Sequence, residues 1–199
     1  MIDIHHLCPG CMGRWEDTEN PCPRCGFSWE RVSGEGRELP PFTILAGRYL
    51  LGRKVGAGGF GITYIAMDLE REETVAVKEF FPVGLAERKG DNVEALPGEE
   101  GKDFRSALRS FQKEAELLSR FSEVEGIVRY RDTVQENQTA YLVMDYVEGI
   151  NLKQQMRQME KPFSQAEALR LMVPILLAVD TMHRGGVLHR DISPENLIR

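Results

Sequence analysis

Four cysteines near the start of the chain have the spacing of metal ligands. They form two Cys-Pro-x-Cys pairs, which are Cys8 with Cys11 and Cys22 with Cys25. Each pair can wrap one turn so that both sulfurs face a common centre, and four thiolates suit tetrahedral zinc. Four sulfur ligands leave no open position for water or substrate. We therefore predict a structural Zn²⁺ site in a small zinc ribbon.

Two other interpretations of the cysteines are disulfides and a redox site. The N-terminus lacks a basic start followed by an apolar run of secretory type, which predicts a cytoplasmic chain with reduced thiols. A redox site would need a surrounding fold to tune the thiol pKa, and a segment of this size has none. His5 and His6 stand close to Cys8, but four thiolates already complete the site. We interpret both histidines as solvent-exposed.

The aromatic residues of this segment allow two interpretations. We expect Trp15, Phe27 and Trp29 to cover the cysteine pairs, and the alternative is that they receive a protein partner. About 30 residues cannot bury enough apolar surface to fold alone, so metal binding would supply the folding free energy. A polar stretch rich in Gly and Pro follows, and it predicts a linker over residues 36–47 after a module over residues 1–35.

A second group of residues with chemical potential is glycine-rich. Gly56, Gly58, Gly59 and Gly61 lie in a G-x-G-x-x-G pattern between two short β-type runs, where backbone amides can approach phosphates closely. In a Rossmann fingerprint the last glycine would open a helix. Here a run of β-branched and aromatic residues follows instead, which favours a loop between two strands.

The glycine pattern resembles the G-x-G-x-x-G-x-V loop of protein kinases, with Thr63 in the valine position. The run Val75-Ala-Val-Lys78 is similar to the family's V-A-I-K, which implies that Lys78 holds the α- and β-phosphates of ATP. The helical run 111–121 would carry its acidic partner. The resemblance implies Glu114 for that role, since it best fits the family position. Two residues turn a helix by about 200°, so only one of Glu114 and Glu116 can face the lysine.

Two later segments complete the resemblance. Residues 142–149 resemble the kinase hinge, which implies that backbone groups of Asp145 and Val147 bind adenine and that Met144 lines the back of the pocket. Residues 189–196 resemble the catalytic loop H-R-D-x-x-x-x-N, which implies that Asp191 accepts the proton of the substrate hydroxyl and that Asn196 holds Mg²⁺. Serine/threonine kinases commonly have lysine where this chain has Ser193, so the γ-phosphate lacks one cation.

The expected fold class is α+β. Five antiparallel strands and one helix would form a kinase N-lobe with its hinge over residues 48–149, and residues 150–199 would begin a helical C-lobe. We expect the strands at 49–55, 62–67, 74–78, 127–132 and 139–145. Residues 82–104 show no periodicity and predict an ordered loop with the helix start. A capping box at Ser164 and Glu167 predicts a helix to about Arg184, with core-facing Leu169, Val173, Leu176, Leu177 and Val179.

Composition limits the partners. A net charge of -6 and a pI near 5.4 argue against nucleic acid as the main partner, and no apolar run reaches the roughly 20 residues of a membrane span. The resemblance implies a bacterial serine/threonine kinase that phosphorylates protein hydroxyls. The D-F-G motif does not occur among the 199 residues, so we expect an N-terminal fragment that is inactive alone. The alternative is a non-catalytic nucleotide-binding or scaffolding chain whose zinc ribbon binds a protein partner.

Overall fold

The computed structural model describes residues 3–31, 36–189 and 191–199. The chain forms two compact units, which are considered separately. The first contains the described residues up to Glu116 together with Arg131–Tyr146, and the second contains Leu117–Tyr130 with Val147–Arg199.

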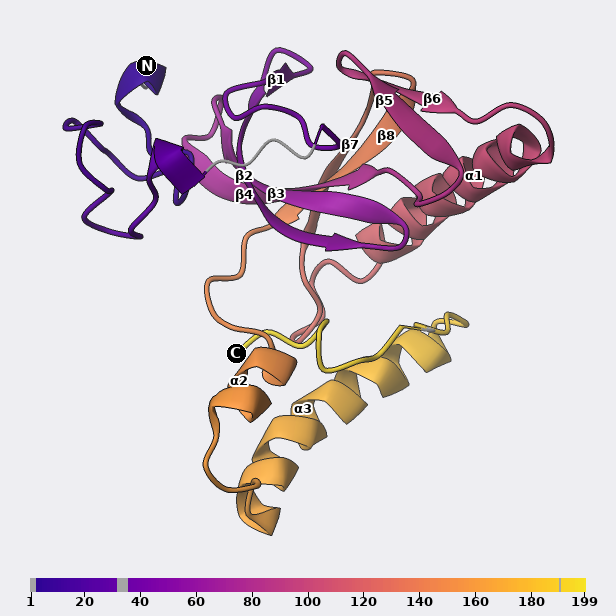
Figure 1. Ribbon diagram of the computed structural model, residues 1–199. Coiled ribbons are helices and arrows are strands. Elements are labelled where there is room, and N and C mark those ends of the chain that lie inside the picture. The colour runs from indigo at the N-terminus through magenta and orange to yellow at the C-terminus, as the bar shows by residue number, and fades with distance from the viewer. Residues whose placement is uncertain (1–2, 32–35, 190) are drawn as a thin grey trace. The chain divides into compact units, whose positions relative to one another are not determined.

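A six-stranded sheet is the framework of the first unit (Figure 1). The strands follow the order β1-β2-β3-β4-β8-β7, and each neighbouring pair from β1 to β8 is antiparallel. Their bounds are β1 Ile44–Leu45, β2 Tyr49–Gly58, β3 Gly61–Asp68, β4 Glu73–Phe80, β7 Tyr130–Glu136 and β8 Thr139–Asp145. The predicted antiparallel sheet is confirmed, with β1 as one additional strand at its edge.

The fourth expected strand lies further along the chain than predicted, at Tyr130–Glu136 rather than at 127–132. It reaches Glu136 because the turn to β8 is a tight one made by Asn137 and Gln138. Both residues have positive φ, 53° and 58°. A two-residue turn of this hand matches the twist of a hairpin.

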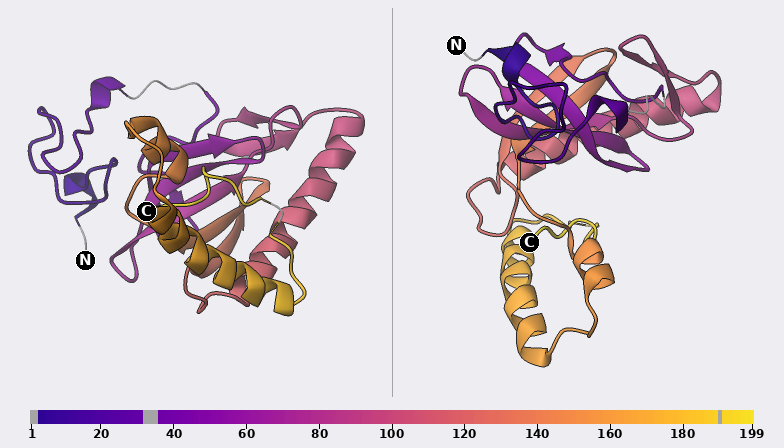
Figure 2. Two further views of the ribbon diagram at one scale, coloured as in Figure 1. Left: turned by 90° about the horizontal axis from the view of Figure 1, so that it is seen from below. Right: turned by 60° about the vertical axis from the view of Figure 1, so that its left-hand side comes forward.

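Helix α1, Glu99–Ser119, lies along the sheet (Figures 1 and 2). Phe104 and Phe111 of α1 contact the Phe80 ring of β4, with ring centroids 5.4 and 5.3 Å apart. The helix predicted over 111–121 is present and begins earlier. Part of the stretch expected to be a loop is a hairpin of β5, Ala86–Lys89, and β6, Asn92–Ala95.

One buried carboxylate joins this hairpin to the sheet. Glu79 of β4 is fully buried, and its oxygens accept hydrogen bonds from Arg88 Nη2 at 2.6 Å, Tyr64 OH at 2.9 Å and Tyr141 OH at 3.2 Å. Burial raises the pKa of Glu79, and the three donors oppose that effect. Arg88 also lies over the Phe81 ring, 4.9 Å from its centroid.

The predicted linker contributes to the same core. Leu39 and Leu45 are buried, and the Leu39 amide donates to the Tyr64 hydroxyl at 3.0 Å. The Arg37 carbonyl accepts a hydrogen bond from Arg88 Nε at 2.6 Å. These described residues therefore pack against the sheet. The predicted domain limits stay a prediction, and residues 32–35 lie outside the described part of the chain.

Two helices lie entirely within the described residues of the second unit. Helix α2, Leu152–Gln158, is a helix not predicted from the sequence, and it begins at an Asn151/Gln154 capping box. Helix α3, Gln165–Arg184, begins at the predicted Ser164/Glu167 capping box. The loop after α2 leads into α3 (Figure 2).

The apolar residues of α3 are mostly exposed, whereas the sequence predicts that they face a core. The described side chains buried on this helix are Ala178 and Met182. Four of the five residues predicted to face a core are exposed, namely Leu169, Val173, Leu176 and Leu177, and Val179 is partly buried. In the described residues, α3 and the other helices are too short or too polar to cross a membrane.

We predict that Glu79→Gln lowers the free energy of unfolding by about 3 kcal/mol, because Arg88 then keeps a buried charge without its counterion. Urea denaturation followed by circular dichroism measures the change. Glu87→Gln is the matched control, since Glu87 is half-exposed in the same hairpin and its pairing with Lys89 contributes at most about 1 kcal/mol. A Glu79→Gln variant as stable as the control would contradict the assigned role of this ion pair.

Candidate metal centre and nucleotide site

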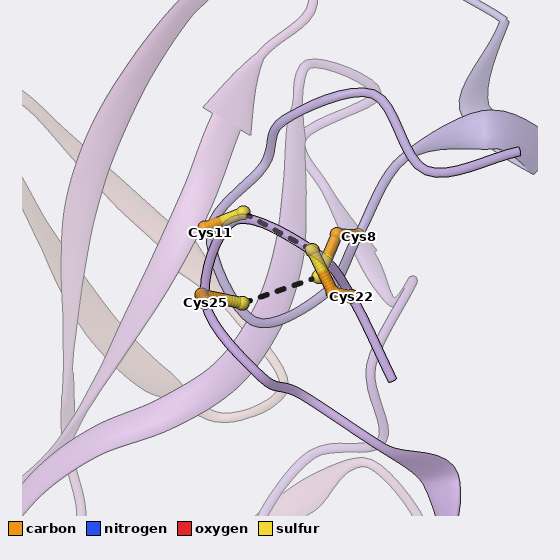
Figure 3. A group of neighbouring side chains, drawn as sticks. All are labelled: Cys8, Cys11, Cys22 and Cys25. Carbon is orange, nitrogen blue, oxygen red and sulfur yellow. Dashed lines mark hydrogen bonds between the residues drawn. The ribbon is translucent and has the colours of Figure 1, made fainter. Parts of the chain in front are cut away.

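The four cysteine side chains converge on one point (Figure 3). Their Sγ atoms all lie within 4.8 Å of one another, with 3.6 Å between Cys8 and Cys25 and 4.0 Å between Cys11 and Cys22. All four are free thiols. A tetrahedral ion with metal–sulfur distances of about 2.3 Å places its sulfurs about 3.8 Å apart, so this arrangement fits zinc.

Backbone turns hold each cysteine pair in place. The Met12 amide donates to the Cys8 carbonyl at 2.8 Å, and the Gly26 amide donates to the Cys22 carbonyl at 2.8 Å. Gly26 has a φ of 69°, which a glycine adopts without strain. Gly10 lets the two turns approach, because a Cβ there would lie 2.5 Å from Phe27 Cβ and 2.8 Å from Cys25 Sγ.

The thiols differ in acidity. Burial raises the pKa values of Cys8 and Cys11. Burial also acts to raise the pKa of Cys22, but hydrogen bonds from the Cys25 and Arg24 amides overcome it and lower this pKa to about 7. Four thiolates this close together would repel one another, and a divalent cation at their centre would remove that repulsion.

Two of the three aromatic rings predicted to cover the cysteine cluster, those of Trp15 and Phe27, pack against it, whereas Trp29 is not part of that cluster. Trp15 is buried in a cluster with Cys8 and Cys22, and Phe27 packs against it. The Trp15 and Phe27 rings meet edge to face at 5.9 Å. His6 is exposed and pairs with Asp3 at 2.8 Å, whereas the His5 side chain lies outside the described part of the structure.

The glycine pattern forms the tip of the β2–β3 hairpin. Gly58 pairs with Gly61 across the turn. A Cβ added at Gly56, Gly58 or Gly59 would meet nothing within 4 Å, so the backbone there is open to an approaching ligand. Gly61 has a different requirement, because a Cβ there would overlap the Glu79 carbonyl oxygen.

Lys78 lies on β4 opposite Thr63 of β3, close to this hairpin tip. Its Nζ is 6.0 Å from the centroid of the Phe111 ring on α1. Glu114 follows Phe111 by three residues and so lies near the same face of the helix, and its side chain is exposed. No ion pair within 4.0 Å joins Lys78 to Glu114 in the described structure. The choice of Glu114 over Glu116 stays a prediction.

The hinge candidates lie at the end of β8. Met144 and Asp145 pair with Ala76 and Val75 of β4. The Asp145 carboxylate is an ion-pair partner of Arg131, so this side chain is occupied and only its backbone groups could serve adenine. Val147 belongs to the second unit and is exposed.

The proposed base and metal ligand are hydrogen-bonded to each other. Asn196 Nδ2 donates to Asp191 Oδ2 at 2.9 Å and to the Asp191 carbonyl at 3.0 Å. The backbone N–H of Asn196 donates to the Ser193 carbonyl at 3.0 Å, which closes the loop. Asn196 thus orients the Asp191 carboxylate, and its own amide oxygen stays available as a hard ligand of the type that Mg²⁺ prefers. Arg190 lies outside the described residues.

The end of this loop is tied to the segment before α2. The Leu152 amide donates to the Leu197 carbonyl at 2.7 Å, and Asn151 forms a β-bridge with Ile198. Lys153 forms an ion pair with Glu195, inside the catalytic-loop motif. Sequence reasoning missed this lysine, because no motif connects residues so far apart. It also missed the buried role of Glu79, whose signal is alternation, because Glu79 lies on the same face of β4 as the apolar Val75 and Val77.

Comparisons with known proteins concern the part of the chain that follows the cysteines. The protein kinase domain family matches residues 49–199. A probable serine/threonine-protein kinase, pknA2 of Bifidobacterium longum, is 32% identical over 161 residues, which are 81% of this chain and 19% of that protein. Serine/threonine-protein kinase PrkC of Bacillus subtilis is 31% identical over 154 residues, 77% of this chain and 21% of that protein.

Two kinds of solved structure are similar as well. One, described as PpkA-294 in its apo form, has a TM-score of 0.75 and 37% identity, with 80% of this chain and 57% of that chain covered. The Mycobacterium tuberculosis PknI kinase domain has a TM-score of 0.62 and 26% identity, with 81% and 57% covered. The chain spans about a fifth of the length of the two curated relatives. The four cysteines lie outside the residues that the family matches.

We predict that the purified chain contains about one zinc ion and that Cys22→Ser removes it, because three thiolates and a hydroxyl make a far weaker site. Metal analysis by mass spectrometry gives the stoichiometry. Ser28→Ala changes a partly buried hydroxyl of the same module that is not one of the four ligands, and it should keep the metal. Cysteines recovered as two disulfides, without metal, after purification under reducing conditions would contradict the prediction.

Proposed function

This chain belongs to the protein kinase domain family, and we propose that it supplies the ATP site and the catalytic loop of a protein serine/threonine kinase. The observation that carries the proposal is the pairing of Lys78 with Thr63, two residues after the last glycine of an open glycine turn. This pairing supports the proposal because the strand of Lys78 runs alongside the strand that leaves the glycine turn, whose backbone amides could bind phosphate. The relatives named as serine/threonine kinases support the same reaction class.

The proposed roles follow the chemistry of each group. The amides of the glycine turn and the Lys78 ammonium would bind the phosphates of ATP, while backbone groups of Asp145 and Val147 would bind adenine. Bound magnesium would neutralise charge on the phosphates, with Asn196 as one ligand. Asp191 would accept the proton of a serine or threonine hydroxyl. The hydroxyl oxygen would bond to the γ-phosphorus while the bond from that phosphorus to the β–γ bridging oxygen breaks, and ADP would leave.

Two further proposals concern the module and its surroundings. We propose that Cys8, Cys11, Cys22 and Cys25 hold a structural zinc ion, supported by their mutual distances. Thiolates that bind zinc must stay reduced, which fits a cytoplasmic location.

A second candidate function is nucleotide binding without phosphoryl transfer. Ser193 favours it, because no side-chain cation stands where the family commonly has one. The two candidates differ in one measurable quantity, the transfer of the γ-phosphate.

We predict that Asp191→Asn lowers kcat by a factor on the order of 10² to 10⁴ while ATP still binds, because the general base is lost. Lys78→Met should lose nucleotide affinity as well as transfer. The measurements are radiolabelled phosphate transfer and ATP titration on a chain extended to include an activation segment. Lys89→Met and Asp180→Asn are the matched controls, since both side chains are exposed and lie outside the proposed site.

Undiminished transfer by Asp191→Asn would refute the assignment of the base. ATP binding without any transfer in the unsubstituted protein would favour the second candidate.

A further inference from the structure

We propose that the cysteine module, residues 3–31, is docked on strand β2 and that Gly52 and Arg53 of this strand are positioning residues for the glycine turn. The module and β2 belong to the same compact unit. The inference rests on the proposed zinc site, because zinc would fix the turn that β2 contacts. Metal binding would then determine how firmly the stem of the glycine turn is held.

The first contact is between backbones. The Arg53 amide donates to the Pro9 carbonyl at 2.7 Å, and Arg53 Nε donates to the Gly10 carbonyl at 3.1 Å. Pro9 and Gly10 are the two residues between Cys8 and Cys11. The peptide groups that accept these hydrogen bonds therefore belong to the turn that carries two of the four thiolates.

The second contact requires a glycine. A Cβ added at Gly52 would overlap the Pro9 carbonyl oxygen and the Met12 Cε methyl, and it would lie 3.0 Å from Ile65 Cγ2. Gly52 has no positive φ that would demand glycine. The close approach of the module is thus the reason for a glycine at this position.

Strand β2 is irregular where the module contacts it. The pairing of β2 with β3 shifts register between Leu51 and Lys54 and again between Lys54 and Gly56. A bulge takes residues out of the ladder and frees their backbone groups for other partners. The amide of Arg53, within the first shift, donates to the module.

An apolar cluster buries the same interface. Leu7 and Met12 of the module pack in one buried cluster with Leu50, Ile65 and Met67 of the sheet. The partly buried residues around this cluster also come from both parts, and they are Ile4, Phe42, Leu69 and Tyr146. The module therefore contacts β2 and β3, the two strands of the glycine hairpin.

A row of aromatic rings makes a further connection. Phe27 contacts Trp29 at 5.4 Å, and Trp29 contacts Phe42 at 5.9 Å. Phe42 lies beside β2, because its amide donates to the Leu51 carbonyl at 2.7 Å. Trp29 is 43% exposed, and its aromatic partner beyond the module belongs to the same chain. This favours docking within the chain over reception of a separate protein.

The position of the contact on β2 suggests its effect. Arg53 precedes Gly56 by three residues on one strand, so the docked module fixes the stem that leads into the glycine turn. If the metal leaves, the Cys8–Cys11 turn keeps its backbone hydrogen bonds but loses its link to the second cysteine pair, so the Pro9 and Gly10 carbonyls are held less firmly. The stem of the turn should then become more mobile.

The test uses the zinc-loaded 199-residue chain and two readouts, amide hydrogen exchange and tryptophan fluorescence. Both tryptophans, Trp15 and Trp29, lie in the module, so the emission reports on it alone. We expect Gly52→Ala to keep one zinc, to exchange the Arg53 amide at least tenfold faster, and to shift the tryptophan emission. The amide of Val77, at the centre of the sheet, should keep its protection.

Gly59→Ala is the matched control for these readouts, because it adds the same methyl to the same hairpin in open space. It should leave the Arg53 exchange rate and the emission unchanged. Zinc chelation of the unsubstituted chain should reproduce the effect of Gly52→Ala on Arg53, which tests the proposal without a variant that could misfold. In the extended chain, Gly52→Ala should raise the KM for ATP several-fold with little change in kcat.

The outcomes separate the two proposals. A zinc-bound Gly52→Ala chain with unchanged Arg53 protection and emission would overturn the docking and leave the zinc site standing. Rapid exchange of Arg53 in the unsubstituted zinc-bound chain would overturn it as well. An unsubstituted chain that binds no zinc would refute the metal site, and the metal dependence of docking would fall with it.

Discussion

The buried carboxylate of Glu79 is the constraint on which the first unit depends. Side chains alternate along a strand, so Lys78 and Glu79 point to opposite faces of β4. Lys78 lies over Phe111 of α1, whereas Glu79 binds Tyr64, Tyr141 and Arg88. The backbone of the same residue lies against Gly61, whose missing side chain allows the approach. One residue thus connects the strand of the lysine, the glycine hairpin and the inserted hairpin.

A buried ion pair of this kind is poor evidence for high stability, because the removal of two charges from water can cancel their attraction. Its effect here is better described as specificity. Arg88 donates hydrogen bonds to the Glu79 carboxylate and to the Arg37 carbonyl. The Glu79 carboxylate therefore fixes the position of the β5–β6 hairpin and, through Arg88, that of the segment before β1. Two apolar side chains in place of Glu79 and Arg88 could pack against each other in several positions. A carboxylate that accepts from three donors has few alternative arrangements.

The sequence predicted what depends on short spacing and missed what depends on distant partners. The two cysteine pairs, the glycine turn, the lysine strand and the capping box of α3 were each readable within about ten residues. Glu79 binds Tyr141, 62 residues further along the chain, and Lys153 pairs with Glu195, 42 residues further on. Two other elements have local partners but a weak pattern: Ile44 and Leu45 of β1 are too few to show alternation, and the short strands of the 86–95 hairpin are mainly polar. The start of α1 at Glu99 was missed because no apolar period marks its first turns.

The same distinction explains the residues of the candidate site. Asp191 and Asn196 are five residues apart in one loop, and the structure joins them by a hydrogen bond. Lys78 and Glu114 are far apart in the sequence, and an ion pair between them requires a specific position of α1 that a motif does not encode. Here the Phe111 ring, rather than a carboxylate, lies next to the lysine ammonium.

The cysteine module and the inserted hairpin act on different strands of one sheet. The module contacts the bulge in β2 before Gly56, and the hairpin is anchored at Glu79, directly after Lys78. Both sets of contacts therefore reach residues that lie next to proposed phosphate-binding groups along the chain. Glycines permit close approach to phosphate because they lack side chains, and for the same reason the turn packs little against its surroundings. The glycine turn must therefore be ordered by the two strands that lead into it and out of it. The module contacts β2 on one side of the turn, and the Glu79 carbonyl lies against Gly61 of β3 on the other.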